Sequence, residues 1–340
     1  MQNTTLKLSK LAKRSTLSRV LGSIVIATGL VMSGSAWAAD KVNVRFSWKL
    51  KGEYAPFYYT EALGYFKEQD LDVTLGEGAG SPAVLGALLQ GQEDVAIMPA
   101  IFALTAIQKG MPVKIISLYH PVAPIVMVSQ PGDPVLEPKD MEGKSVGHAI
   151  GETGTTYLPT FCAVNNIDCG KIRRITMDSQ MRVTQYIQGQ VDMVSIYRSN
   201  DLPLLEAQMG TVPPTLDLGE YGLRVPGLAA VASAATIEKR GDVLRRYLEA
   251  VAKGMEATRS DPEAATQAIL ASWAGAPDAA LVQKMVQATV DAVPPAGDKP
   301  LGWIETEAIT EALALLESAD STLGTLKPAE EFFTNELLTE

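Results

Sequence analysis

The stretch "QGQEDVAIMP", residues 90–99, has a counterpart in "QGQVDMVSIY", residues 188–197. In each stretch a glycine closes a predicted helix, an aspartate follows, and an apolar run then begins a strand. Each predicted strand ends near a small or an aromatic residue, Ala100 just after the first stretch and Tyr197 at the end of the second. A repeated helix-to-strand junction of this kind predicts two lobes that are built in the same way.

Each junction lies within a series of alternating strands and helices. Residues 42–48 alternate apolar and polar side chains like a strand, residues 55–66 repeat apolar side chains at helical spacing, and residues 71–78 read as the next strand. A helix over 101–110 and a strand over 113–119 follow the first junction. Repeated strand-helix-strand units of this kind predict an α/β fold with a mainly parallel sheet covered on both faces.

The second junction is preceded by a strand near 145–151, a helix over 153–168, a strand over 171–178 and a helix over 179–190. From about Leu228 the sequence becomes Ala-rich with sustained helical spacing, which predicts a helical C-terminal part. In the last predicted helix, over 300–319, four apolar side chains share one face: Ile304, Ile309, Leu313 and Leu316.

The N-terminus has the pattern of a secretory signal peptide. Five cations precede an apolar run over 20–32, and Ala36-Trp37-Ala38 forms a small-x-small cleavage site. The run of about 13 residues is shorter than the roughly 20 that a membrane-spanning helix needs. We therefore expect a cleaved signal over residues 1–38 and export to the periplasm, with a retained anchor as the alternative. No cysteine lies near the cleavage site, so we expect no lipid anchor.

Charge and cysteine content narrow the possible functions further. Removing the signal takes away five cations and no acids, so the formal charge falls from −10 to −15, and such a surface repels nucleic acid. Cys162 and Cys169 lie seven residues apart, and export favours a local disulfide over two buried thiols. With only His120 and His148 available as ring bases, we expect no thiol catalysis, no metal site and no cofactor.

Ligands of open α/β sheets bind outside the carboxyl ends of the strands, and those ends are marked in the sequence. In the first lobe, Trp48 ends a strand, Ser81 is placed to cap the next helix before Pro82, and Ala100 follows a third strand. An indole with nearby aromatic rings suits a flat aromatic ligand. The expected contacts are Trp48, Tyr54, Phe57, Ser81 and Ala100. Trp48 could instead only cover the core, and Ser81 could only cap its helix.

In the second lobe, the loop "GETGTTYLP" places hydroxyls and a flexible glycine where a helix begins. A strand then ends at Tyr197, and Arg198 could form a fork onto a carboxylate or sulfonate, or pair with a surface acid. Asp192 is expected to begin its strand without touching the ligand. The expected contacts are Thr153, Gly154, Thr155, Thr156, Tyr197 and Arg198, with Glu220 and Tyr221 near the return to the first lobe.

Six segments in order carry a family resemblance: "SWKLKGEYAPFYYTEALGYFKEQDLDVTL", "GSPAVLGALLQGQEDVAI", "KGMPVK", "PKDMEGKSVG", "DPEAA" and "EEFFTNELL". The chain resembles periplasmic substrate-binding proteins of ABC importers, and among these the thiamine-pyrimidine-precursor (NMT/THI-like) group, related to nitrate, taurine and alkanesulfonate binders. The resemblance implies the two-lobed type II periplasmic-binding-protein fold with two mainly parallel sheets. Its two interlobe crossings would lie near residues 126–130 and 221–228, with lobe 1 formed by 39–127 and 226–340 and lobe 2 by 128–225.

The function implied is that of a monomeric, non-enzymatic receptor that closes on a small organic ligand and delivers it to an ABC importer permease in the inner membrane. The resemblance favours a pyrimidine-type thiamine precursor, with an aromatic carboxylate or sulfonate as the alternative. A thiamine-pyrimidine synthase is an alternative of another class. Those relatives carry a Cys-rich iron-associated motif and a reacting histidine, whereas this chain has two isolated cysteines and two histidines. Whether a chemoreceptor also binds the ligand-bound protein is left open.

Overall fold

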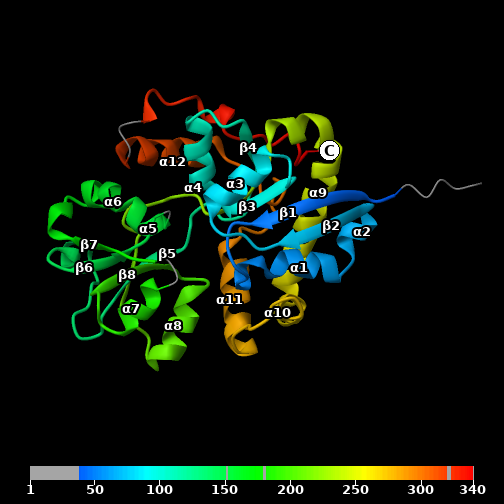
Figure 1. The fold of residues 1–340 in the computed structure, drawn as a ribbon. Helices are drawn as coiled ribbons and strands as arrows, with labels where there is room; N and C mark the ends of the chain where they lie inside the picture. The colour runs from blue at the N-terminus through cyan, green and yellow to red at the C-terminus, as the bar shows by residue number, and fades with distance from the viewer. Residues whose placement is uncertain (1–37, 151, 179–180, 320–322, 340) are drawn as a thin grey trace, which may run out of the picture. The chain divides into compact units, whose positions relative to one another are not determined.

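The computed structural model describes residues 38–150, 152–178, 181–319 and 323–339 (Figure 1). The predicted signal peptide lies outside the described residues, apart from Ala38. Among the helices of the described part, none has the length and apolarity that a membrane crossing requires. Residues 38–340 form one compact unit that contains two five-stranded sheets.

The two sheets have the same strand order. The first runs β2 (Leu71–Gly76), β1 (Asp40–Phe46), β3 (Val95–Pro99), β10 (Leu228–Ser233) and β4 (Val113–Leu118). The second runs β7 (Arg173–Thr176), β6 (Ser145–His148), β8 (Met193–Tyr197), β5 (Ile125–Ser129) and β9 (Thr215–Asp217). In each sheet the first three strands pair in parallel, and the fourth is antiparallel to both of its neighbours. Each sheet therefore has two parallel and two antiparallel strand pairs, because the strand that enters from the other lobe runs opposite to its neighbours.

The repeated sequence junction is a repeated structural junction. Gly91 and Gly189 both have a φ of 69°, a left-handed conformation that glycine adopts without strain. The carboxylates of Asp94 and Asp192 then accept the backbone N–H groups of Asn43 and Ser145, at 2.9 and 2.7 Å. Asn43 lies on β1 and Ser145 on β6, the parallel neighbours of β3 and β8. Each aspartate thus ties the start of its own strand to the neighbouring parallel strand, and Asp192 directly precedes β8, at the strand start that the sequence predicted.

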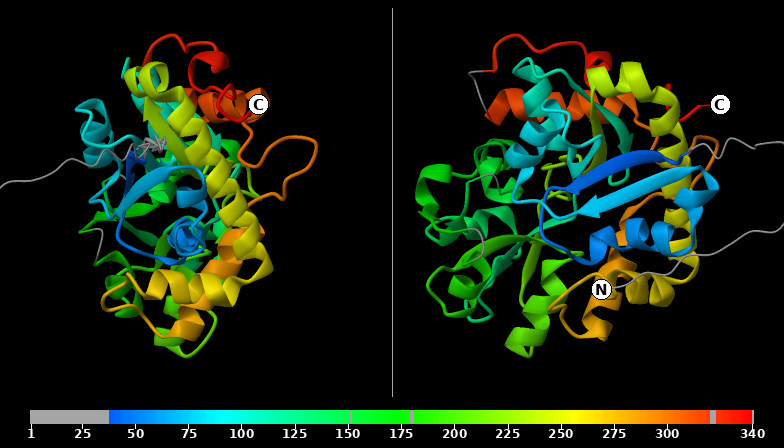
Figure 2. Two further views of the ribbon diagram at one scale, coloured as in Figure 1. Left: turned by 90° about the vertical axis from the view of Figure 1, so that its right-hand side faces the viewer. Right: turned by 45° about the vertical axis from the view of Figure 1, so that its right-hand side comes forward.

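Alternation along the strands of the first sheet divides its side chains between two layers of helices. Val42, Val44 and Phe46 of β1 face one layer, built mainly of α1 (Ala55–Ala62), α9 (Ala234–Ser260), α10 (Pro262–Leu270) and α11 (Ala279–Ala292). Ala96 and Met98 of β3 face the other, built of α3 (Ser81–Leu89), α4 (Ala100–Gln108) and α12 (Thr306–Ala319). Figure 2 shows the long helix α9, drawn in yellow, beside the first sheet. The four side chains expected on one face of the last helix are all buried, three of them on α12 and Ile304 just before its first residue, Thr306.

Two departures from the predicted elements concern the first lobe. Residues 228–233 were expected to begin the helical part, but they form β10, whose six residues are all buried between β3 and β4. The helix predicted over 55–66 divides at Gly64, which has a φ of 79°, into α1 and α2 (Tyr65–Glu68). Phe66 then stacks on Tyr247 of α9, with ring centroids 5.7 Å apart.

The second sheet is covered in the same manner. Val126, Val128 and Val194 face α7 (Arg182–Ile187) and α8 (Asp201–Met209), whereas Met127 and Met193 face α6 (Leu158–Val164), which follows α5 (Thr153–Thr156). A disulfide joins Cys162 of α6 to Cys169 of the 3₁₀ helix η3 (Cys169–Lys171), with their Cα atoms 5.6 Å apart. Three further short helices are η1 (Gly52–Tyr54), η2 (Pro138–Met141) and η5 (Ala329–Glu331).

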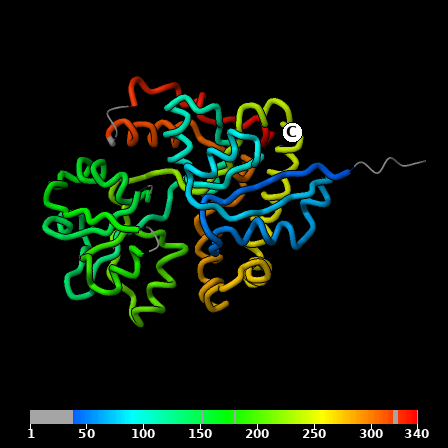
Figure 3. The backbone as a smooth tube through the Cα atoms, viewed as in Figure 1, coloured from blue at the N-terminus to red at the C-terminus, as the bar shows by residue number. Residues whose placement is uncertain are grey.

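The chain passes between the sheets twice, after β4 and before β10, and Figure 3 lets the reader follow both passages. The two connections lie side by side, because Gly227 donates its N–H to the carbonyl of His120 at 2.8 Å and His120 donates its own to Leu228 at 3.1 Å. A Cβ atom at Gly227 would lie 2.9 Å from the His120 Cβ. Residues 126–129, expected near the first crossing, belong to β5, so the chain leaves the first sheet a few residues earlier.

The buried imidazole of His120 is expected to make folding sensitive to mild acid. Burial lowers the pKa of His120, and the nearby Glu53 charge only partly offsets this effect. A lowered pKa means that the folded state resists protonation, so the stability it contributes is present above the unfolded pKa of about 6.5 and is lost as pH falls below it. The free energy of unfolding, measured with urea, should fall by up to about 1.4 kcal/mol per pH unit between pH 7 and pH 5 through this group.

The matched variants are His120→Leu and His148→Gln. His120→Leu should flatten the loss of stability between pH 7 and pH 5, whereas His148→Gln should change it less because His148 is only half-buried. An equal pH dependence in wild type and His120→Leu would show that His120 is not the group responsible.

Candidate functional site

A cavity of about 570 Å³ lies between the two lobes, at the carboxyl ends of β1, β3 and β8. This is the place where open α/β sheets bind ligands, and its volume suits a small organic molecule. The first lobe contributes Ser47, Trp48, Lys51, Glu53, Ala79, Gly80, Ser81, Pro82, Ala83, Pro99, Phe102 and Leu228. The second lobe contributes Ile150, Glu152, Thr153, Arg182, Val183, Ser195, Ile196, Tyr197 and Asp201. We call this cavity the cleft.

The wall from the first lobe depends on close packing of a glycine-rich loop. Gly78 and Gly80 donate their N–H groups to the carbonyls of Trp48 and Ser47, at 3.1 and 2.7 Å. A Cβ atom at Gly78 would lie 2.1 Å from the carbonyl oxygen of Phe46, so only glycine allows this approach. Gly80, not Ser81, is the N-cap of α3, and Ser81 is its first residue. The loop therefore holds the backbone of Ser47 and Trp48 against the segment that leads into α3, and both Trp48 and Ser81 line the cleft.

The wall from the second lobe is organised by Glu152, which caps α5. Its carboxylate accepts the N–H groups of Gly154 and Thr155, at 2.7 and 2.9 Å, and the hydroxyls of Thr155 and Ser195. Arg182 donates to the carbonyl of Ser195 at 2.8 Å. A Cβ atom at Gly154 would lie 2.5 Å from the Ser195 hydroxyl, so a glycine is needed here too. This network fixes the loop that the sequence predicted, through a glutamate that was not predicted.

One end of the cleft holds a buried cluster of charges. The Lys51 ammonium lies 3.2 Å from a carboxylate oxygen of Glu53, and 5.6 and 5.3 Å from the ring centroids of Tyr54 and Tyr197. Burial by itself would lower the pKa of Lys51, but the charges of Glu53 and Asp201 outweigh it, so the pKa is raised and the ammonium stays charged. Burial raises the pKa of the Asp201 carboxyl, an effect that Lys51 partly offsets.

Four of the residues predicted to contact a ligand line the cleft: Trp48, Ser81, Thr153 and Tyr197. The structure places the others elsewhere. Tyr54 and Phe57 are fully buried in the core, where both rings pack against Phe46 at 4.1 and 5.5 Å between centroids. Ala100, Gly154 and Thr155 are buried behind the wall, and Thr156 bonds back to Glu152.

Three further predicted residues lie on other surfaces. Arg198 pairs with Asp217 at 3.0 Å, the surface alternative that the sequence left open. Glu220 and Tyr221 are exposed and do not line the cleft.

Every charged residue that lines the cleft is missing from the predicted contacts: Lys51, Glu53, Glu152, Arg182 and Asp201. Three of them carried a usable signal. Lys51 and Glu53 lie in the loop and 3₁₀ turn that follow β1, and Asp201 lies four residues after the end of β8. The strand-end rule that selected Trp48 and Tyr197 therefore covers all three. Arg182 carried no such signal, because it lies at the start of a helix.

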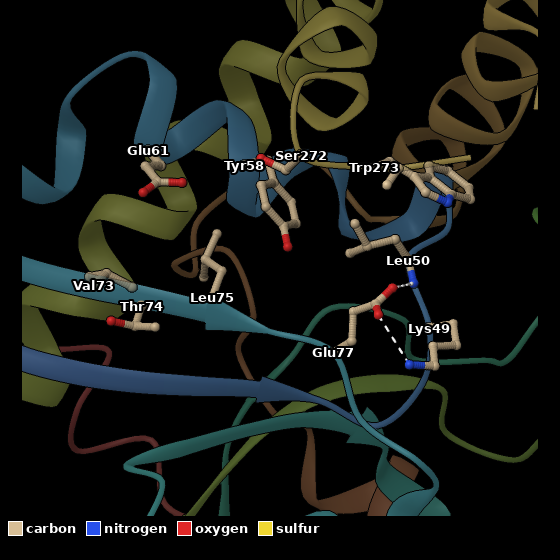
Figure 4. A pocket seen from close by; sticks show the side chains of 11 residues that line it. Lys49, Leu50, Tyr58, Glu61, Val73, Thr74, Leu75, Glu77, Ser272 and Trp273 are labelled. Carbon is tan, nitrogen blue, oxygen red and sulfur yellow. Dashed lines mark hydrogen bonds and ion pairs between the residues drawn. The ribbon is translucent and has the colours of Figure 1, made fainter. Parts of the chain in front are cut away.

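A second hollow, of about 770 Å³, lies on the outer side of the loop that carries Trp48 and is shown in Figure 4. Glu77 accepts the Leu50 N–H at 2.7 Å and pairs with Lys49 at 3.2 Å, and Tyr58 and Trp273 stand over it. The hollow is open and is walled by the first lobe alone. The cleft has walls from both lobes and is therefore the candidate ligand site.

Comparisons with known proteins agree with this architecture. The periplasmic aliphatic sulphonate binding protein SsuA from Escherichia coli has a similar structure, with a TM-score of 0.69 and 16% identity, covering 87% of this chain and 92% of that chain. At such identity the likeness shows the fold alone. It confirms the predicted two-lobed periplasmic-binding-protein fold.

Two curated proteins are similar in sequence. The 4-amino-5-hydroxymethyl-2-methylpyrimidine phosphate synthase THI13 of Saccharomyces cerevisiae is 22% identical over 241 residues, 66% of this chain and 69% of the yeast protein. The riboflavin-binding protein RibY of Chloroflexus aurantiacus is 22% identical over 231 residues, 66% of this chain and 64% of that protein. The model of the family described as NMT1/THI5 like matches residues 51–265, more than half of the chain, and the chain therefore belongs to the NMT1/THI5-like family.

Proposed function

We propose that this protein is a periplasmic solute receptor that binds a pyrimidine-type thiamine precursor in the cleft and delivers it to the permease of an ABC importer. The observation that carries the proposal is the cleft itself, a cavity of about 570 Å³ with walls from both lobes. Export is supported by the N-terminal pattern, and the disulfide suits an oxidising compartment. The similarity to a riboflavin-binding protein and to a pyrimidine phosphate synthase supports a flat nitrogen heterocycle as the ligand.

The lining of the cleft favours this ligand over an aromatic carboxylate or a sulfonate. Among the described residues that line it, three are acids and two are bases, so an added anion would meet a net negative wall. Arg198, the residue expected to hold an anion, is paired with Asp217 and lies off the cleft. Trp48 and Phe102 supply aromatic faces for stacking, and the Asp201 carboxyl can accept from an amino group.

The cleft also favours binding over catalysis. Among the described residues that line it, none is a histidine or a cysteine. His120 is fully buried in the connection between the lobes, and both cysteines of the chain are joined in the disulfide. The synthase alternative therefore has no ring base or thiol at the place where a substrate would sit.

The test is native mass spectrometry of protein purified from the periplasm, before and after unfolding and refolding, followed by calorimetric titration. The stripped protein should bind 4-amino-5-hydroxymethyl-2-methylpyrimidine and bind benzoate and taurine far more weakly. Trp48→Ala should weaken pyrimidine binding roughly tenfold to a hundredfold, because a stacked aromatic contact contributes about 1–3 kcal/mol.

Trp273→Ala is the matched control, because Trp273 stands over the outer hollow and not the cleft. Turnover of the bound compound would overturn the receptor assignment. Tighter binding of benzoate or taurine than of the pyrimidine would overturn the ligand assignment and leave the receptor in place.

A further inference from the structure

The buried charges at the end of the cleft form a direct connection between the two lobes. Asn200, which precedes α8 in the second lobe, accepts the N–H of Glu53 at 3.2 Å and donates to its carboxylate at 2.7 Å. Glu53 belongs to the 3₁₀ helix η1 (Gly52–Tyr54) of the first lobe. Glu53 and Asn200 are 5% and 2% exposed, so neither has a substantial alternative partner in water. One amide thus satisfies both a backbone donor and a buried carboxylate across the lobe boundary.

The same carboxylate holds the lysine that lines the cleft. One oxygen of Glu53 faces Asn200, and the other lies 3.2 Å from the Lys51 ammonium. Lys51 is also placed between an aromatic ring of each lobe, Tyr54 of the first and Tyr197 of the second. The ammonium has three N–H donors, and among the described residues Glu53 is the one carboxylate paired with it, so donors remain for an acceptor atom in the cleft.

The backbone on both sides of this connection packs against the same helix, α11. Gly52 packs so closely on α11 that a Cβ atom there would lie 2.2 Å from the Met285 Cβ, and α8 of the second lobe also contacts α11. Figure 1 shows α8 and α11 next to each other. Separating the lobes would break both Asn200 bonds at once and admit water to the Lys51–Glu53 pair. An ion pair gains most when it is dry and fully hydrogen-bonded, so the pair is at its most favourable only with the lobes together.

We propose that Glu53 and Asn200 form an interlobe clasp, and that the clasp aims Lys51 at an acceptor atom of the ligand only when the lobes are together. Glu53 and Asn200 are positioning residues, and Lys51 is the residue that donates to the ligand. The role of Lys51 rests on the proposed function, whereas the clasp itself does not. The test of the clasp therefore uses ligand-free protein, so that the clasp and the proposed function can fail separately.

The variant is Asn200→Ala, and the chain offers a close control in Asn335→Ala. Asn335 also accepts one N–H and donates once, at 3.1 and 2.9 Å, but both bonds go to Ile304 within the first lobe. Each variant loses two hydrogen bonds to a distant residue, and Asn200→Ala also loses the bond that Asn200 donates to its neighbour Ser199 at 3.2 Å. Only in Asn200→Ala do the two distant bonds join the lobes. Asn200→Asp is a second variant, since it keeps the shape of the side chain but cannot donate to Glu53.

Two measurements on the stripped, ligand-free proteins decide the question. Small-angle X-ray scattering should show a larger radius of gyration for Asn200→Ala and Asn200→Asp than for wild type and Asn335→Ala. Acetylation of Lys51 by an amine-reactive reagent, measured against the exposed Lys49 as internal reference, should be roughly tenfold faster in the two Asn200 variants, the effect of losing hydrogen bonds to a charged group.

An unchanged radius of gyration in both Asn200 variants would overturn the clasp, whether or not Lys51 becomes more reactive. Equal changes in Asn200→Ala and Asn335→Ala would overturn it as well, because they would report general loosening. If native mass spectrometry finds no ligand while the Asn200 variants open as expected, the clasp stands and the proposed function fails.

Discussion

Replacing Lys51 by methionine is expected to lower the free energy of unfolding by about 3 kcal/mol at pH 7, because it leaves a buried carboxylate without its cation. The Lys51 side chain is 22% exposed and that of Glu53 is 6% exposed, so water replaces little of the lost interaction. Asn200 would remain as a partner for one carboxylate oxygen only. Urea unfolding at pH 7 measures the effect, and an unchanged slope with denaturant shows that the folded state stays compact.

Lys49→Met is the matched control two residues away. Lys49 pairs with Glu77 at 3.2 Å, the same distance as Lys51 from Glu53, but their side chains are 67% and 36% exposed. The change should cost less than about 1 kcal/mol, as for other exposed pairs. Adding Glu53→Gln to Lys51→Met should restore most of the lost stability, since no unpaired charge then remains. Equal costs for Lys51→Met and Lys49→Met would show that burial does not govern this pair.

The sequence predicted the strand ends better than it predicted the side chains that reach the cleft from them. Tyr197 ends β8, Trp48 lies two residues beyond the end of β1, and both line the cleft. The position of a strand end follows from apolar alternation and the turn residues beyond it. The repeated junction at Gly91 and Gly189 was also predictable, since local backbone chemistry decides it. These features depend on residues close together in the chain.

What the sequence could not show depends on residues far apart in the chain. Tyr54 and Phe57 follow the same strand end as Trp48, and only the packed helices show that both rings turn into the core around Phe46. The partner of Glu53 is Asn200, 147 residues away, and no periodicity relates the two. Residue type was also a poor guide at Arg198, because its guanidinium, which could have bound an anionic ligand, is paired with Asp217 instead.

The second large effect on stability is expected where helices α1 and α9 of the first lobe pack against each other. Gly254 lies in the interior of α9, where alanine normally stabilises a helix by about 1 kcal/mol relative to glycine. A Cβ atom there would lie 1.7 Å from the Thr60 hydroxyl, 2.8 Å from the Thr60 Cβ and 3.1 Å from the Pro56 carbonyl oxygen. Thr60 is fully buried and its hydroxyl is bonded to that carbonyl at 2.7 Å, so it has little room to move.

Gly254→Ala should therefore lower the free energy of unfolding by about 3 kcal/mol, because α1 and α9 must separate or strain and overpacking outweighs helix propensity. Gly86→Ala is the matched control, since Gly86 also lies inside a helix, α3, with open space where its Cβ would be. It should raise the free energy of unfolding by about 0.5 to 1 kcal/mol. Opposite signs in urea unfolding would establish that close contact between α1 and α9 selects the glycine. A gain in stability for both variants would mean that the two helices can move apart at little cost, and that the first lobe is less rigid than its packing indicates.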